Sequence, residues 1–294
     1  MNKEKTLSNI LLLITASIWG FGFVAQRYGM DYIGPFYFTG IRFLLGAVIL
    51  IPVLTLNLKK NNNYKSLDYK FLFKGGLCAG LIMFSGMALQ QAGLVYTTAS
   101  NGGFITGLYI VIVPIISLFL KQKPKIFVWI GILIAAPGLY LLSINKGFTM
   151  QRGDFLIFLS IFFWAAHIHV ISYFSARTMP IFLAFLQFLF CAFAGTVCGL
   201  LFENISLKII SDAIIPIFYA GVIGVGVGFT LQVQAQKKAD PNHAALILSM
   251  EAVFAAAGGI ILLNETMPAK KIFGCIFILA GIIVSQLDFN KKNI

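Results

Sequence analysis

The sequence predicts an all-α integral membrane protein whose ten transmembrane helices form two inverted five-helix repeats. Three observations predict this fold class: a strongly apolar composition, ten long hydrophobic runs joined by short connections, and a repeat that relates the two halves. Of the 294 residues, 59% are hydrophobic and 11% are charged. Because soluble domains carry about 25% charged residues, the composition excludes a soluble globular protein.

The ten hydrophobic runs supply the transmembrane helices. A helix that spans a bilayer needs about 20 mostly apolar residues, and the connections between the runs are too short for a soluble domain. A β-barrel is disfavoured because the runs are continuously apolar and lack the alternation of a barrel strand. The predicted helices cover residues 7–26, 35–56, 71–93, 99–120, 126–143, 153–174, 180–202, 213–235, 243–263 and 271–287.

Lysine and arginine residues predict the orientation. With a cytoplasmic N-terminus, fifteen of the 22 basic residues face the cytoplasm, six face the other side, and Arg42 lies inside the second helix. The positive-inside rule then places both termini in the cytoplasm, in a cell membrane of the inner or plasma type. The net charge of +12 is therefore interpreted as a signal of topology and not of nucleic-acid binding, and the lipid bilayer is the expected partner.

The two halves of the chain repeat. Trp19 in "ASIWGFGF" matches Trp164 in "SIFFWAAH" at an offset of 145 residues, and "TASNGGFI" (98–105) matches "DPNHAALI" (240–247) at an offset of 142. The predicted units are residues 1–146 and 147–294. Because each unit has an odd number of helices, the second is inverted relative to the first, and inverted repeats are typical of secondary transporters that bind substrate near the midplane.

Several segments carry a family resemblance. They are "ASIWGFGFVAQ", "GPFYFTGIRFLLGA" and "TTASNGGFITGLYIVIVPI" in the first half, with "NHAALILSMEAVFAAAGGIILLNE" and "FGCIFILAGII" in the second. Together they resemble the drug/metabolite transporter superfamily, specifically its EamA-type members. The resemblance implies a cavity enclosed by helices 1, 3, 4, 6, 8 and 9, and alternating access. The sequence also has no G-x-x-x-x-G-K-S/T motif and no acidic cluster that could hold Mg²⁺, so we expect a transporter without a cofactor and without enzymatic activity.

The resemblance leaves the substrate open. Export of an amino acid or a similarly small amphiphilic metabolite is favoured. Import or exchange of a larger compound, nucleotide-like or methyl-donor-like, is the alternative, and an intramembrane enzyme or scaffold is the least favoured reading. Monomer and homodimer both stay open.

Glu251 is the only charged residue between His243 and Asn264. A carboxylate near the bilayer centre costs roughly 2.5–3.5 kcal/mol on insertion scales, so we ask what it faces. Residues three and four apart share a helix face, and small residues such as Ala255 and Gly258 on the face of Glu251 indicate close helix packing. Glu251 is therefore expected to point into the protein, either as a binding or proton-relay group or as a hydrogen-bonded link between helices.

The repeat extends this site. Asn101 and Tyr109 occupy the repeat positions of His243 and Glu251 at an offset of 142. Two-fold pseudo-symmetry predicts that Tyr109 and Glu251 lie on facing walls of one cavity, and it also pairs the two tryptophans. The substrate-binding residues predicted are Trp19, Asn101, Tyr109, Trp164, His167, Gln232 and Glu251.

The remaining polar residues have two interpretations each. His167 shares a face with Trp164 and serves either a substrate wall or a core hydrogen bond, whereas Gln232 serves either a polar route or a contact between helices. For Arg42 a structural role is favoured, by snorkelling to the outer interface or by pairing with an acid. His167 and His169 point to opposite sides of one helix and cannot share a metal, so no metal site is predicted.

Overall fold

A computed structural model describes residues 3–60, 68–143, 151–265 and 269–285, and within these ranges the chain is helical with no strand. The first half contains α1 (Lys3–Gly29), α2 (Pro35–Lys60), α3 (Tyr69–Leu94), α4 (Ala99–Gly107), α5 (Tyr109–Phe119) and α6 (Ile126–Ser143). The second half contains α7 (Arg152–Ser175), α8 (Pro180–Phe202), α9 (Leu207–Asp212), α10 (Ile214–Phe218), the π-helix η2 (Tyr219–Phe229), α11 (Thr230–Gln236), α12 (Pro241–Leu248), α13 (Glu251–Leu263) and α14 (Ala269–Ser285). The predicted boundary at residues 146 and 147 lies outside the described residues.

Eight segments of the described chain are long and apolar enough to cross a membrane, and they correspond to eight of the ten predicted helices. The fifth and tenth runs differ, because the apolar stretches found within the fully described parts of α6 and α14 are Ile126–Gly138 and Ile272–Ser285. Both are shorter than the about 20 residues that span a bilayer without adjustment. The multi-pass α-helical fold is confirmed, while a count of ten full membrane crossings stays a prediction.

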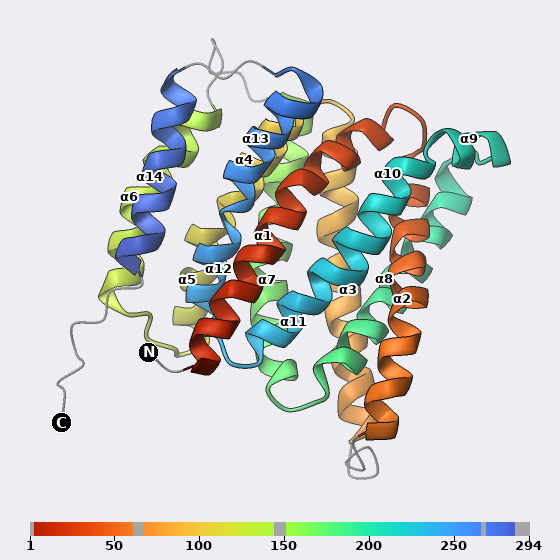
Figure 1. The fold of residues 1–294 in the computed structure, drawn as a ribbon, viewed down its shortest axis with the longest axis horizontal. Helices are drawn as coiled ribbons and strands as arrows, with labels where there is room; N and C mark the ends of the chain where they lie inside the picture. Colours follow the sequence, from red (N-terminus) through yellow and green to blue (C-terminus); the bar gives the residue numbers. More distant parts are fainter. Residues whose placement is uncertain (1–2, 61–67, 144–150, 266–268, 286–294) are drawn as a thin grey trace.

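The helices are arranged around a central group (Figure 1). α2 packs along α8 at one side of the molecule, and α6 packs along α14 at the other. Between them, α1, α3 and α7 lie close to α4–α5, α12–α13 and the segment formed by α10, η2 and α11. α1 begins and α14 ends toward the same end of the molecule in this view.

The contact between α6 and α14 shows that the halves are inverted. A Cβ atom built on Gly131 would lie 2.6 Å from the carbonyl oxygen of Gly281, and one built on Gly138 would lie 2.6 Å from that of Gly274. Gly131 and Gly138 are the repeat partners of Gly274 and Gly281 at an offset of 143, so each contact is the image of the other. Two antiparallel helices related in this way require a two-fold axis perpendicular to them, as predicted.

Local sequence explains where several helices begin. Thr98 Oγ1 accepts a hydrogen bond from Asn101 N at 3.2 Å, and Asp240 Oδ1 accepts one from Asn242 N at 3.0 Å. These N-caps occupy repeat positions and satisfy backbone donors that have no partner within their helices. Glu203, at the end of α8, accepts hydrogen bonds at 2.8 Å from two backbone N–H groups in the first turn of α2.

Three interruptions of regular helix lie near the centre. The backbone changes to hydrogen bonds between residues three apart at the α4–α5 junction, where Val111 N donates to Leu108 O at 3.0 Å. The α12–α13 junction does the same, with Ala252 N donating to Ser249 O at 3.1 Å. The third interruption is the glycine-rich π-helix η2. π-helical segments are rare and occur often at functional sites.

Candidate functional site

A buried cavity lies where the two halves meet. Its walls come from α1, α3, α4–α5, α7, η2–α11 and α12–α13, the six spans that the resemblance implies, and α2 contributes Arg42. The space open to the centre of a water molecule is about 50 Å³, and a single water needs about 10–15 Å³ on this measure. In this conformation the cavity therefore holds a few waters, and a larger ligand requires the walls to move.

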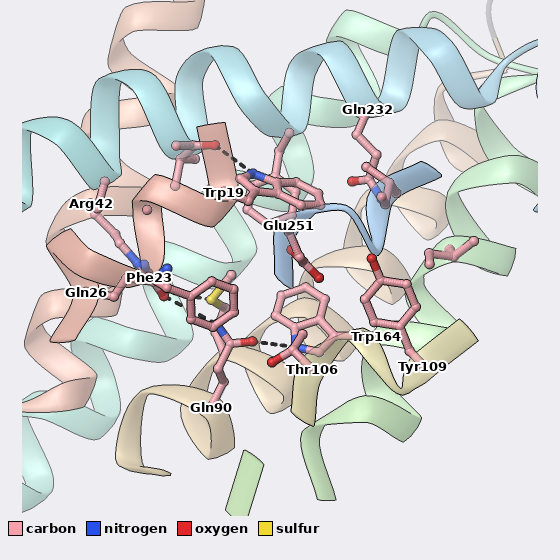
Figure 2. Close-up of a pocket in the computed structure, with 18 residues that line it drawn as sticks. Trp19, Phe23, Gln26, Arg42, Gln90, Thr106, Tyr109, Trp164, Gln232 and Glu251 are labelled. Carbon is pink, nitrogen blue, oxygen red and sulfur yellow. Dashed lines mark hydrogen bonds between the residues drawn. The ribbon is translucent and has the colours of Figure 1, made fainter. Parts of the chain in front are cut away.

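Glu251 and Tyr109 occupy the centre of this cavity (Figure 2). Each is the first residue after a helix interruption, since α13 begins at Glu251 and α5 begins at Tyr109. Their side chains lie close enough to interact with each other. Neither Glu251 Oε1 nor the Tyr109 hydroxyl makes a hydrogen bond of standard geometry with another described residue. Because Glu251 is only 3% exposed, it presents a desolvated carboxyl with unused bonding capacity.

Aromatic rings form one wall. Phe229, the last residue of η2, lies between the two symmetry-related tryptophans, with ring-centroid distances of 4.4 Å to Trp19 and 6.1 Å to Trp164. Trp19 Nε1 donates a hydrogen bond to the carbonyl oxygen of Gly224 in η2 at 3.2 Å. The rings therefore join both halves of the chain at one point and give the cavity a rigid apolar surface.

A chain of amides crosses the opposite wall. Trp164 Nε1 donates to Gln90 Oε1 at 2.8 Å, and Gln90 Nε2 donates to Gln26 Oε1 at 3.4 Å. Gln232 lies on the other side of the cavity, and its Oε1 atom has no hydrogen-bond partner among the described residues. Each amide can both donate and accept, so the wall can match polar groups of a neutral or zwitterionic ligand.

The structure brings together five of the seven predicted site residues. Trp19, Tyr109, Trp164, Gln232 and Glu251 line the cavity. Asn101 and His167 do not. Asn101 lies eight residues before Tyr109 and therefore about 12 Å away along the helix direction. The His167 ring is fully buried outside the cavity lining, where Nε2 is 3.0 Å from Gln187 Oε1, a position that fits its alternative interpretation as a core residue.

The structure corrects the interpretation of Arg42. This residue neither snorkels to the interface nor pairs with an acid: it is 2% exposed, lines the cavity, and has no carboxylate partner among the described residues. Gln26, Thr106 and Phe229 also line the cavity and were not predicted. The sequence held a signal for two of these residues: Gln26 lies two turns beyond Trp19 on one helix, and Phe229 directly follows the glycine-rich run.

The described residues contain no group of three or more His, Cys, Asp or Glu side chains that could hold a metal ion. Glu251 is the only carboxylate that lines the cavity in the described part of the chain. This arrangement offers a site for reversible binding, built from aromatic faces, amides and two buried ionisable side chains, Arg42 and Glu251.

Comparisons with known proteins agree with this fold and site. The chain is 32% identical over 290 residues to an uncharacterized transporter of Archaeoglobus fulgidus. The match covers 97% of this chain and 87% of the relative. It is 22% identical over 294 residues to the uncharacterized transporter YoaV of Bacillus subtilis, covering 94% and 96% of the two chains. The crystal structure of another protein superposes on this chain with a TM-score of 0.75 at 16% identity, and the match covers 97% of both chains.

A family model matches the chain twice, over residues 6–144 and 151–286, and its description is the EamA-like transporter family. Each match covers five of the predicted helices. This protein is therefore a multi-pass membrane protein and not an enzyme, and it belongs to the EamA-like transporter family.

Proposed function

We propose that this protein is a secondary active transporter that exports an amino acid or a similarly small amphiphilic metabolite across the cytoplasmic membrane. One observation carries the proposal: a buried cavity at the interface of two inverted repeats combines aromatic walls with polar groups that lack partners. Unsatisfied polar groups in a membrane interior are costly, so a polar ligand that satisfies them gains affinity. The aromatic surface supplies contact area for an apolar side chain.

The proposed mechanism is alternating access, in which residues 1–146 and 147–294 move relative to each other around the fixed cavity. The interruptions at Leu108 and Ser249 and the π-helix η2 support it, because irregular turns change their hydrogen bonding more easily than regular helix. They lie beside Tyr109, Glu251 and Phe229. A small backbone change there would alter the cavity walls directly.

Glu251 is the group that we propose for proton coupling. A carboxyl in a closed cavity binds either a proton or a polar group of the substrate, and this competition is what exchange between protons and substrate requires. We place the protein in the inner or plasma membrane. The charge asymmetry of the loops supports an orientation with both termini in the cytoplasm. Proton entry through the cavity would then drive substrate outward.

The test is transport by purified protein in liposomes. Vesicles loaded with a panel of labelled amino acids, nucleotides and methyl-donor compounds are assayed for efflux with and without an inward proton gradient. The proposal expects efflux of a small amino acid or related metabolite, accelerated by the gradient. Efflux confined to nucleotide-like or methyl-donor compounds would refute the substrate class and favour the larger-substrate alternative.

A further inference from the structure

Arg42 is a buried cation whose electrostatic requirement the protein does not meet. It lies seven residues after the start of α2, about 10 Å along the helix from its end, and is 2% exposed. One terminal nitrogen donates to the thioether sulfur of Met87 at 2.7 Å, and Nε has no partner among the described residues. A thioether is a weak acceptor, and burying an unpaired charge is strongly unfavourable.

The surroundings of Arg42 hold it in place without neutralising it. The guanidinium carbon lies 5.0 Å from the ring centroid of Phe38 and 5.5 Å from that of Phe43. Cation–π contacts of this kind stabilise a desolvated cation and fix its orientation. A fixed, desolvated guanidinium that opens on a cavity is a ready site for a carboxylate, which it binds through two parallel hydrogen bonds.

Glu251 is the complementary group. It is the one acid among the described residues that line the cavity, its Oε1 atom lacks a partner, and no basic side chain pairs with it. Figure 2 shows Arg42 and Gln26 toward one side of the cavity and Glu251, Tyr109 and Gln232 toward the other, with Trp19 and Phe23 between them. The two ionisable groups thus lie toward different parts of one cavity, where each can face an opposite charge on the same ligand.

We propose that Arg42 and Glu251 form a two-charge site that selects zwitterions, with the substrate carboxylate on Arg42 and the substrate ammonium group on Glu251. The proposal rests on the function proposed above and narrows its substrate class to compounds that carry both charges. It also gives Arg42 a role in specificity. A simple amine or a simple carboxylate leaves one of the two buried charges unpaired, an uncharged metabolite leaves both unpaired, and the site rejects them for that reason.

The test measures ligand binding to the purified full-length protein by calorimetry. Two sets of compounds serve as probes: leucine, leucinamide and 4-methylpentanoate, then alanine, alaninamide and propionate. Within a set the amide lacks the carboxylate and the acid lacks the ammonium group, while the apolar part is almost unchanged. The wild type is expected to bind each amino acid about 10- to 100-fold more tightly than either analogue, since hydrogen bonds to charged groups have this magnitude.

Two variants separate the charges. Arg42→Gln, which introduces the residue found at its repeat position 187, is expected to lose the preference for the amino acid over its amide and keep the preference over the acid. Glu251→Gln is expected to do the reverse. Arg27→Gln is the matched control, because Arg27 pairs with Asp31 at 2.7 Å on the exposed end of α1, and it should bind all six compounds as the wild type does.

A third variant keeps the test decisive if Arg42→Gln fails to fold. If Arg42→Gln is not monodisperse, Arg42→Lys decides, because lysine keeps the charge and loses the bidentate geometry. It should weaken amino-acid binding and leave amide binding unchanged.

Three results would overturn the proposal. An Arg42→Gln protein that still binds the amino acid more tightly than its amide refutes the two-charge site and leaves the proposed function standing. A double variant Arg42→Gln/Glu251→Gln that binds amino acids as tightly as the wild type shows that the two side chains interact only with each other and do not bind the substrate. A wild type that binds none of the six compounds and exports another kind of metabolite refutes the proposed function together with the site.

Discussion

Tyr109 and Glu251 each begin the second segment of an interrupted helix, and their side chains meet in one cavity although 142 residues separate them in the chain. The two-fold relation between the halves places both interruptions at the centre of the molecule. Irregular backbone at membrane depth is tolerated where it is buried in protein or lines a cavity. The tyrosine and the glutamate thus lie directly at the irregular turns of their helices.

Replacement of Glu251 tests the coupling role. As pH falls from 8 to 5, protonation of Glu251 should weaken the binding of a substrate that carries an ammonium group, because the neutral carboxyl no longer attracts it. Glu251→Gln should bind this substrate at least about 10-fold more weakly and show no change with pH over this range. Calorimetry at pH 5, 6, 7 and 8 measures both effects. Asp212→Asn, at an exposed site on α9, is the control, and an unaltered pH profile in Glu251→Gln would rule out the coupling role.

Removal of the Trp164 hydrogen bond tests the amide wall. Trp164→Phe keeps an aromatic ring and leaves Gln90 Oε1 without its donor at 2.8 Å. The buried oxygen should lower the stability of the protein by about 1–3 kcal/mol, measured by thermal unfolding in detergent. Trp129→Phe, on the peripheral helix α6, should have a smaller effect. A Trp164→Phe/Gln90→Leu double variant should regain part of the loss, and a double variant less stable than both single variants would contradict this explanation.

A pair of glycines on α1 tests the packing that supports Glu251. A Cβ atom at Gly20 would lie 2.7 Å from the carbonyl oxygen of Glu251 and 2.9 Å from Ala255 N, whereas the nearest atom to a Cβ at Gly22 is 3.7 Å away. Gly20→Ala should therefore separate α1 from α13 and reduce both thermal stability and transport, by about 1–3 kcal/mol in stability. Gly22→Ala should keep the melting temperature of the wild type, because its Cβ atom meets no close neighbour. Equal melting temperatures for the two variants would contradict the close approach of these helices.

His167 distinguishes a core residue from a binding residue. His167→Leu removes the partner of Gln187 Oε1, and a buried amide without a partner should cost about 1–3 kcal/mol of stability. Substrate affinity should stay within a factor of two or so of the wild type, because the ring lies outside the cavity lining. The paired measurements are thermal unfolding and calorimetric binding. A large loss of affinity with unchanged stability would return His167 to the substrate site.

The sequence predicts the larger features because they follow from hydrophobicity and repetition. Apolar runs indicate the helices, the offset between Trp19 and Trp164 indicates the repeat, and small residues beside Glu251 indicate the buried face. The offset also predicts that Tyr109 approaches Glu251, although the two residues are far apart in the chain. Each of these signals is carried by residue types at fixed spacing.

What the sequence does not predict depends on contacts between distant segments. Arg42 resembles an arginine near a helix end, and only the fold shows that the cavity extends to it. The partner of His167 is Gln187 on the next helix, which no spacing rule identifies. The run of glycines that ends at Phe229 indicates a helix that bends or packs closely, but it does not distinguish these from the π-helix that forms.

The central claim is that substrate binds in the cavity between the halves. The most direct measurement is substrate protection of Thr106→Cys, a cavity-lining position, in a protein whose four native cysteines are replaced by alanine. A membrane-permeant thiol reagent labels the protein in liposomes with and without the transported compound, and Asn101→Cys, outside the cavity, is the control. We expect the compound to slow labelling at position 106 several-fold and to leave position 101 unchanged. Equal labelling rates at position 106 with and without a compound that the same liposomes transport would contradict the claim.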